Sequence, residues 1–186
     1  MRAVVVYESI YGNTRAVAEA IAVGLTPYAT VLPVELATPD QLAVVDLLVV
    51  GAPTHMHGLS RSATRRLAVK TARRPDNRMA VEPQAAGPGV REWLASIGRL
   101  SCQAVAFDTR LDGLALLTGR ASWRISRLLR RHGAHLMAHS RSFLLDKQSQ
   151  LLEGELDRAR AWGESLARRA ADSSSGRPAA LGPPEA

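Results

Sequence analysis

Short runs of apolar residues alternate with longer amphipathic segments along most of the chain. The short runs have the length of buried strands, and the longer segments repeat their apolar residues with the period of a helix. The predicted strands are 3–7, 29–35, 46–51, 103–107 and one within 135–144. The predicted helices are 14–25, 63–71, 88–97, 122–131 and 153–170. This alternation predicts an α/β domain, in which helices cover both faces of a parallel sheet.

The last part of the chain departs from this pattern. After Ala171 the residues are mostly polar, with several Ser, Gly and Pro and no apolar period. Such a composition is typical of segments that cannot build a packed core. We therefore expect one domain over residues 1–171, followed by a disordered tail over 172–186.

The composition indicates where in the cell the protein is expected and what its cysteine can do. Hydrophobic residues make up 46% of the chain, as in ordinary globular proteins, and no apolar run approaches the roughly 20 residues of a membrane-spanning helix. The N-terminus lacks the basic and then apolar layout of a secretory signal, so we expect a cytoplasmic protein without a membrane contact. The single cysteine, Cys102, excludes an internal disulfide and is expected to be a small buried side chain.

The net charge of +7 comes almost entirely from arginine, because only Lys70 and Lys147 are lysines. The arginines are scattered over several predicted helices, and no aromatic residues are interleaved with them. Nucleic-acid surfaces usually cluster basic residues on one face, so we expect no nucleic acid as a partner. Solvated helix faces are the favoured interpretation of these arginines, and a weak attraction to an acidic partner protein is the alternative.

The most informative segment joins the first predicted strand to the first predicted helix. Its residues are Ser9, Ile10, Tyr11, Gly12, Asn13 and Thr14. Hydroxyl, amide and backbone N–H groups at a helix N-terminus can hold a phosphate without a lysine. The preceding carboxylate, Glu8, is expected to turn away from such an anion. The alternative is an ordinary turn between a strand and a helix. The glycine patterns of Rossmann loops and P-loops are absent.

Two further loops should lie beside the first one. Small and polar residues follow the third strand, namely Pro53, Thr54, His55, Met56, His57 and Gly58, and others follow the fourth strand, namely Asp108, Thr109 and Arg110. Ligands of open parallel sheets bind at the carboxyl ends of the strands, where the strand order reverses. We therefore expect the three loops to converge on one crevice. A metal site at His55 and His57 is disfavoured, because no third ligand has a suitable spacing.

Two segments carry a resemblance to a known family. The sequence V-V-Y-E-S-I-Y-G-N-T-R-A-V-A over 5–18 resembles the flavodoxin signature, and V-V-G-A-P-T over 49–54 is similar to the second flavin loop of that family. The resemblance extends in layout over about residues 2–170. It implies a three-layer flavodoxin-like fold with five parallel strands in the order 2-1-3-4-5. It also implies non-covalent binding of FMN, with the phosphate at residues 9–14 and the isoalloxazine ring beside residues 53–58 and 108–110.

The chain departs from flavodoxins around the implied ring site. Flavodoxins usually carry a tryptophan or similar aromatic residue in the second loop and a tyrosine in the loop after strand four, and both are missing here. His55 and His57 either contact the flavin edge or lie in a surface loop. Arg110 either stabilises the negatively charged reduced flavin or faces solvent.

The charge is a second departure. Electron-carrying flavodoxins are usually acidic, whereas this chain is basic, so its redox partner is expected to be acidic. The favoured function is an FMN-binding protein that carries electrons. An NAD(P)H-dependent FMN or quinone reductase on the same fold is the first alternative. A binding domain that has lost its flavin is the second.

Overall fold

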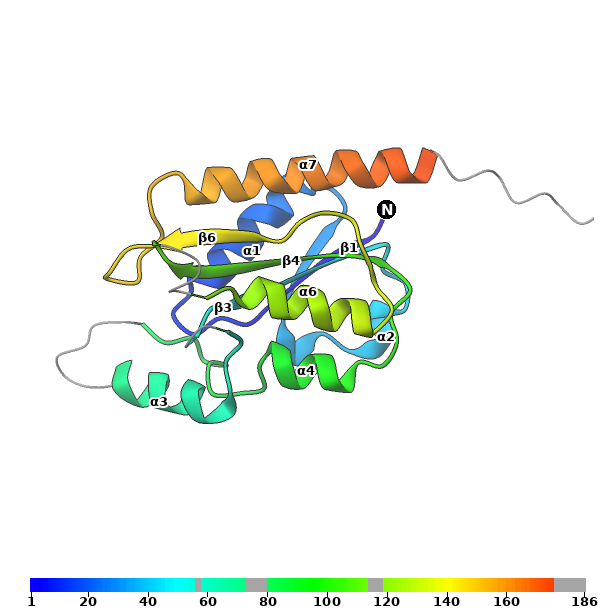
Figure 1. The fold of residues 1–186 in the computed structure, drawn as a ribbon. Coiled ribbons are helices and arrows are strands. Elements are labelled where there is room, and N and C mark those ends of the chain that lie inside the picture. Colours follow the sequence, from blue (N-terminus) through cyan, green and yellow to red (C-terminus); the bar gives the residue numbers. More distant parts are fainter. Residues whose placement is uncertain (56–57, 73–79, 114–118, 176–186) are drawn as a thin grey trace, which may run out of the picture.

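The computed structural model describes residues 1–55, 58–72, 80–113 and 119–175. At its centre is a parallel sheet in the order β2-β1-β3-β4-β5, with β6 also paired to β4 (Figure 1). The strands are β1 (Ala3–Tyr7), β2 (Ala29–Pro33), β3 (Leu47–Pro53), β4 (Gln103–Leu111), β5 (His135–Leu136) and β6 (Arg141–Leu145). The predicted strand order is confirmed. The predicted fifth strand forms two pieces, which lie against the beginning and the end of β4.

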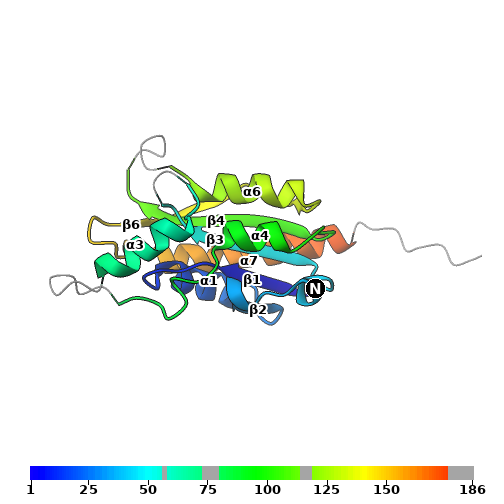
Figure 2. The same ribbon diagram turned by 90° about the horizontal axis from the view of Figure 1, so that it is seen from below.

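Helices cover both faces of the sheet, as predicted (Figures 1 and 2). One face packs against α1 (Asn13–Gly24) and α7 (Glu155–Ser175). The other packs against η1 (Val34–Leu36), α2 (Pro39–Leu42), α4 (Val90–Ser96) and α6 (Ala121–Arg131). The remaining helix, α3 (Ser62–Ala72), lies beyond the carboxyl ends of the strands. Among the described residues, no helix is both long and apolar enough to cross a bilayer.

Successive residues of the central strands face opposite cores. In β1, Val5 packs with α1 and α7, whereas Val4 and Val6 pack toward α4 and α6. In β3, Val49 and Val50 divide between the two cores in the same way. Strands that are buried on both faces appear in the sequence as continuous apolar runs, which explains why these two strands were predictable.

Several boundaries differ from the prediction. The two short elements η1 and α2 were not predicted, because three or four residues are too few to show a helical period. At the other end of the chain, α7 continues to Ser175, past the expected domain boundary at residue 171. Residues 176–186 lie outside the described residues, so a disordered tail there stays a prediction.

The prediction that Asp108, Thr109 and Arg110 form a loop is wrong. All three residues belong to β4 and pair in register with Ser142, Phe143 and Leu144 of β6. They are also buried. The pairing with β6 extends the ladder beyond the apolar run at 103–107, and polar side chains hid this extension in the sequence.

Two glycines allow α1 and α7 to pack closely together. A Cβ atom on Gly163 of α7 would lie 2.2 Å from the carbonyl oxygen of Ile21 in α1. A Cβ atom on Gly24 of α1 would lie 2.1 Å from the carbonyl oxygen of Arg160. Backbone atoms cannot move aside as a flexible side chain can, so both positions need glycine for steric reasons.

Replacing Gly163 by Ala is therefore expected to destabilise the fold. Helix propensity alone favours Ala over Gly by about 1 kcal/mol, but overpacking typically costs about 1–3 kcal/mol, and the contact here is with backbone. The free energy of unfolding in urea should fall for Gly163→Ala. Ala161→Gly, at an exposed position of the same helix, should lose only the propensity difference of about 1 kcal/mol. An unchanged or raised stability of Gly163→Ala would contradict this packing argument.

Candidate functional site

The loop between β1 and α1 is closed by its own side chains. Gly12 is the N-cap of α1 and has a φ of 87°, in the left-handed region that favours glycine. Its N–H donates to the Ser9 hydroxyl oxygen over 3.1 Å. The first N–H groups of α1 have no acceptor within their own helix, so they are suited to bind an anion.

A pair of buried hydroxyl groups lies beneath this loop. The Thr14 and Thr109 hydroxyl oxygens are 2.8 Å apart, and the two residues are 2% and 1% exposed. One hydroxyl hydrogen joins the two oxygens, so the other hydrogen is available to a ligand. The pair also links the start of α1 to β4, two segments that the sequence analysis expected to meet.

A cavity of about 190 Å³ opens at the carboxyl ends of β1, β3 and β4. The described residues that line it are Ser9, Ile10, Tyr11, Asn13, Thr14, Pro53, Thr54, His55, Thr109, Arg110, Leu111, Leu145 and Ser149. The cavity lies where the strand order reverses, between β1 and β3. The structure therefore brings together residues from all three segments, as expected. Gly12, Gly58 and Asp108 are not among the lining residues.

Two described residues of the second segment, His55 and Gly58, are hydrogen-bonded to each other. The His55 N–H donates to the Gly58 carbonyl oxygen over 2.7 Å, and the Gly58 N–H donates back over 3.0 Å. Burial and the nearby charge of Arg65 lower the pKa of His55, so its imidazole is neutral at neutral pH. His55 lines the cavity, whereas Met56 and His57 lie outside the described residues.

The two charged residues at the end of β4 have different surroundings. The Asp108 carboxylate accepts the N–H of Ser122 over 2.8 Å, so it caps the beginning of α6. The Arg110 guanidinium lines the cavity and donates to the carbonyl oxygens of Leu111 and Gly113, over 3.1 and 2.9 Å. Only Arg110 of these two therefore lies where it can act on a ligand.

One wall of the cavity was not predicted from the sequence. Leu145 ends β6, and Ser149 follows it in a turn. The Asn13 amide donates to the Ser149 carbonyl oxygen over 2.7 Å, so this turn closes on the loop between β1 and α1. Asn13 and Ser149 are 136 residues apart along the chain, so no local sequence pattern could predict their contact.

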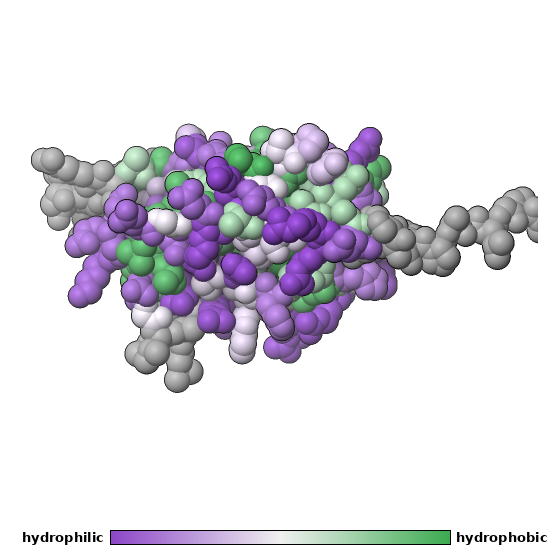
Figure 3. All heavy atoms as spheres, turned by 90° about the horizontal axis from the view of Figure 1, so that it is seen from above, coloured by the Kyte–Doolittle hydropathy of each residue, from purple (hydrophilic) through white to green (hydrophobic). Residues whose placement is uncertain are grey.

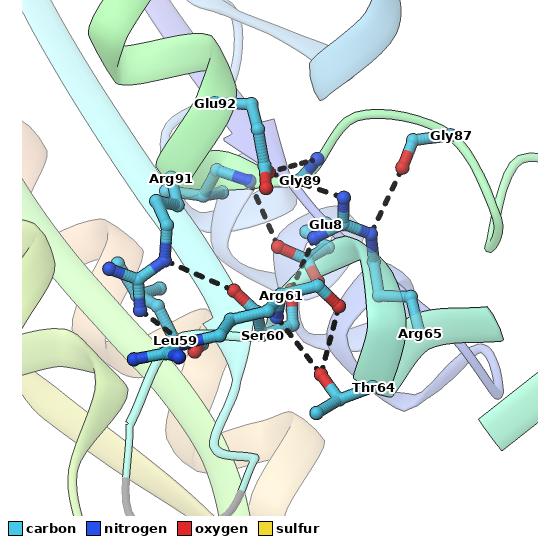
Figure 4. Close-up of polar contacts among 11 residues, drawn as sticks. Glu8, Leu59, Ser60, Arg61, Thr64, Arg65, Gly87, Gly89, Arg91 and Glu92 are labelled. Carbon is cyan, nitrogen blue, oxygen red and sulfur yellow. Dashed lines mark hydrogen bonds and ion pairs between the residues drawn. The ribbon is translucent and has the colours of Figure 1, made fainter. Parts of the chain in front are cut away.

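Behind the loop, Glu8 points into a network of polar groups (Figure 4), and it is not among the described residues that line the cavity. Its side chain is 4% exposed. One carboxylate oxygen accepts the Ser60 hydroxyl, and the other accepts the Val90 N–H over 2.9 Å. The Glu8 carboxylate therefore faces away from the loop residues that line the cavity, as expected. Its partners come from the segment after β3 and from the start of α4.

Arg65 completes this network. The sequence analysis interpreted its arginine pair as solvated, but Arg65 is only 2% exposed. Its guanidinium donates to the Ser60 hydroxyl oxygen over 2.8 Å and to the Gly87 carbonyl oxygen over 3.0 Å. It also lies 3.2 Å from a Glu92 carboxylate oxygen (Figure 4). The interpretation of Arg65 was wrong, because tertiary partners allow its charge to be buried.

The outer side of the loop packs against α3 and the segment that precedes α4. Ile10 belongs to a small apolar cluster with Ala68, Val69 and Ala85. The Glu82 N–H donates to the Ile10 carbonyl oxygen over 2.9 Å. These contacts hold the loop from the side opposite β4. In the part of the chain that the structure describes, no group of three His, Cys, Asp or Glu side chains is placed to bind a metal.

Comparison with known proteins gives matches in structure alone. No protein-family model matches the sequence, and no curated protein matches it. A flavodoxin from the domain Archaea is 20% identical with a TM-score of 0.62, over 92% of this chain and 99% of that chain. Flavodoxin 1 from Bacillus cereus is 16% identical with a TM-score of 0.62, over 90% of this chain and 98% of its own. This chain has the flavodoxin-like fold.

A third similar structure is a flavodoxin, WrbA-like protein from Agrobacterium tumefaciens. It is 21% identical with a TM-score of 0.59, over 92% of this chain and 98% of that chain. The three structures have nearly their whole length in common with this flavodoxin-like chain. The resemblance predicted from residues 5–18 and 49–54 is therefore confirmed for the fold.

Replacing Glu8 by Gln is expected to change the pH dependence of stability. Burial raises the pKa of Glu8 above its ordinary value of 4.5, although Ser60, Val90 and Arg65 oppose the shift. A raised pKa in the folded state contributes stability below the unfolded-state value, and this contribution is lost as the pH rises through the folded-state value. The free energy of unfolding of the native chain, minus that of Glu8→Gln, should therefore fall as the pH rises above about 4.5.

Urea unfolding at successive pH values measures this difference. It should be constant below the unfolded-state pKa and level off again above the folded-state value. A difference that rises with pH would mean that the charge of Arg65 outweighs the cost of burial, contrary to this expectation.

Proposed function

We propose that this chain binds FMN, with the phosphate at the N-terminus of α1 and the ring near His55 and Arg110. One observation carries the proposal. The loop from Ser9 to Gly12 is fixed by its own hydrogen bond and borders a cavity at the point where the strand order reverses. The fold common to this chain and several flavodoxins supports it.

The residues present fit the phosphate end of FMN. The N–H groups of the first turn of α1 and the remaining hydroxyl hydrogen of the Thr14–Thr109 pair supply donors, and the helix dipole adds a favourable potential. The described residues enclose about 190 Å³, less than the roughly 300 Å³ of small sites that bury a whole drug-sized ligand. The phosphate end would therefore be enclosed, and the ring would lie at the rim.

Bound FMN would supply the ability to accept and donate electrons, and the protein residues would supply its binding, orientation and electrostatic environment. Thr54 holds the second segment in place, because its N–H donates to the Thr109 carbonyl oxygen and its hydroxyl accepts the N–H of Ala121. Neutral His55 adds no charge at the rim. Arg110 is a buried cation that favours a negative charge on its neighbour.

We propose electron transfer with an acidic partner protein as the role of the bound flavin. The positive net charge of +7 supports the sign of the partner, and no acid–base pair is needed for such a role. The reductase alternative makes a different prediction in a simple assay. Rapid oxidation of NADPH or NADH by the purified flavin-loaded protein, without a separate reductase, would favour the enzyme over the carrier.

Replacing Thr14 by Val is expected to weaken FMN binding. A lost hydrogen bond to a charged group costs about 1.5–3 kcal/mol, so the Kd measured by quenching of flavin fluorescence should rise by about tenfold or more. Riboflavin lacks the phosphate, so its Kd should change far less. Thr30→Val makes the same chemical change at an exposed position of β2 and should leave both Kd values unchanged.

Two results would contradict the proposed site. Native protein that binds neither FMN nor riboflavin would favour the flavin-free binding domain. A Thr14→Val variant that loses FMN and riboflavin to the same extent would place the phosphate elsewhere. Unfolding curves of the variant separate a lost ligand contact from a loss of the fold.

Replacing Arg110 by Gln is expected to lower the midpoint potential of the bound FMN. The guanidinium charge stabilises the negatively charged reduced form, so its removal should shift the potential down by roughly tens of millivolts. Arg110→Lys retains the charge and should shift the potential less. Arg2→Gln removes an equal charge at an exposed position and serves as the control in the same redox titration. An unchanged potential in Arg110→Gln would remove Arg110 from the mechanism.

A further inference from the structure

The positive charge of the chain is concentrated in one segment. Residues 113–145 contain no Asp or Glu and carry six arginines, Arg120, Arg124, Arg127, Arg130, Arg131 and Arg141, so the segment contributes +6 of the net charge of +7. This segment includes α6, β5 and β6, which lie at one edge of the sheet. The charge of the folded protein is therefore one-sided, although the arginines looked scattered in the sequence.

A large groove lies along this edge, between α6 and α7. It has a volume of about 840 Å³, and its described lining includes no Asp or Glu but four arginines, Arg127, Arg130, Arg141 and Arg169, together with His139. A second hollow of about 300 Å³ continues it, because Leu136, Met137 and Arg169 line both. Figure 3 views the molecule from the side of α7, where hydrophilic residues cover most of the surface. The groove and the phosphate cavity have no lining residue in common.

The floor of the groove is the part of the sheet edge that α7 leaves open. Beside it, along β6, the Glu155 carboxylate accepts the Leu144 N–H over 2.9 Å, and Arg158 donates to the Ser142 carbonyl oxygen. These two side chains cover the outer backbone groups of β6. At β5, the N–H groups of His135 and Met137 both donate to carbonyl oxygens at β4. Successive residues of a strand direct their backbone groups to opposite sides, so the N–H and carbonyl groups of Leu136 point outward. An exposed edge of this kind can pair with another chain.

Two tryptophans flank the open edge. Trp162 of α7 is buried, and the Arg141 guanidinium lies 5.9 Å from the centre of its ring. Trp123 of α6 lines the same groove and is 71% exposed. Exposed Trp and Arg side chains together are typical of the residues that contribute most to protein interfaces.

We infer that this groove binds an extended acidic segment of a partner protein. The carboxylates of the segment pair with Arg127 and Arg130 on one wall and with Arg141 on the other. Its backbone lies along the outward-facing groups of Leu136, and its side chains cover Trp123. Arginine forks match carboxylates in geometry, and no Asp or Glu is among the described residues that line the groove. Asp172 lines only the smaller hollow that continues it.

The proposal does not depend on flavin binding, and its test keeps the two apart. The probe is a fluorescein-labelled octaglutamate peptide, titrated into the full chain and followed by fluorescence anisotropy. A Gly/Ser peptide of the same length and an oligo(dT) of similar charge are the comparisons. The charge-reversal variant is Arg127→Glu with Arg130→Glu, two exposed positions that leave the core untouched. Arg2→Glu with Arg66→Glu changes the net charge equally at exposed positions outside the groove.

We expect octaglutamate to bind and the Gly/Ser peptide not to bind. The charge-reversal variant should weaken octaglutamate at least about tenfold, and the control variant by less than about twofold. Added salt should weaken binding because exposed charges are screened. Bound octaglutamate should also protect a tryptophan from acrylamide quenching, and this protection should vanish in Trp123→Phe.

Three results would overturn the proposal. The first is that octaglutamate does not bind. The second is that the charge-reversal and control variants weaken octaglutamate binding equally. The third is that oligo(dT) binds more tightly than octaglutamate through Arg127 and Arg130. The last result would identify a single-stranded nucleic acid as the occupant. A protein that fails to bind FMN but passes the peptide test would leave this inference standing, because the two sites are separate.

Discussion

Glu8 and Arg65 meet through the hydroxyl of Ser60 at a point where four segments of the chain converge. Glu8 directly follows β1, Ser60 follows β3, and Arg65 belongs to α3. The network is completed by the Gly87 carbonyl, just before α4, and by the N–H of Val90, the first residue of α4. Both charges are nearly inaccessible to solvent. Removal of one partner from such a pair leaves an uncompensated buried charge, which typically costs about 3–5 kcal/mol. The network therefore holds Ser60, Arg65 and the start of α4 against the segment that follows β1.

The loop between β1 and α1 is held between that network and β4. On one side, Ile10 packs against α3, and its carbonyl oxygen accepts the Glu82 N–H. On the other side, Thr14 meets Thr109, and Asn13 reaches Ser149. A loop that is fixed before the ligand arrives loses less entropy on binding. Residues 9–14 contain no lysine, so fixed backbone N–H groups and hydroxyl groups would have to attract a phosphate in place of a formal charge.

The two hollows of the molecule differ in the charge that surrounds them. At the phosphate cavity, positive potential comes from a helix N-terminus and from Arg110, whose guanidinium is bonded to nearby carbonyl groups. At the sheet edge, it comes from arginines that are exposed on α6. The first arrangement suits one enclosed phosphate group. The second suits a longer, flexible polyanion, because exposed arginines can adjust to it. The two proposed anion sites of this basic chain therefore differ in kind.

The sequence by itself determined the fold class, the strand order through a family resemblance, and the loop that lines the cavity at the strand ends. These features depend on local patterns: apolar runs that are buried on both faces, a helical period, and a glycine at the start of α1. Cys102 was also interpreted correctly, since it lies in the apolar core.

Only the tertiary structure decided the rest. Whether Arg65 is buried depends on Glu8, Ser60 and Glu92, which approach it from distant parts of the chain. Whether 108–110 is loop or strand depends on pairing with β6, because polar residues carry no strand period. The basic groove exists because α6 and the sheet edge bring their arginines together across the fold. Charge and hydrogen-bond partners act through space, so their effect cannot be obtained from the order of residues alone.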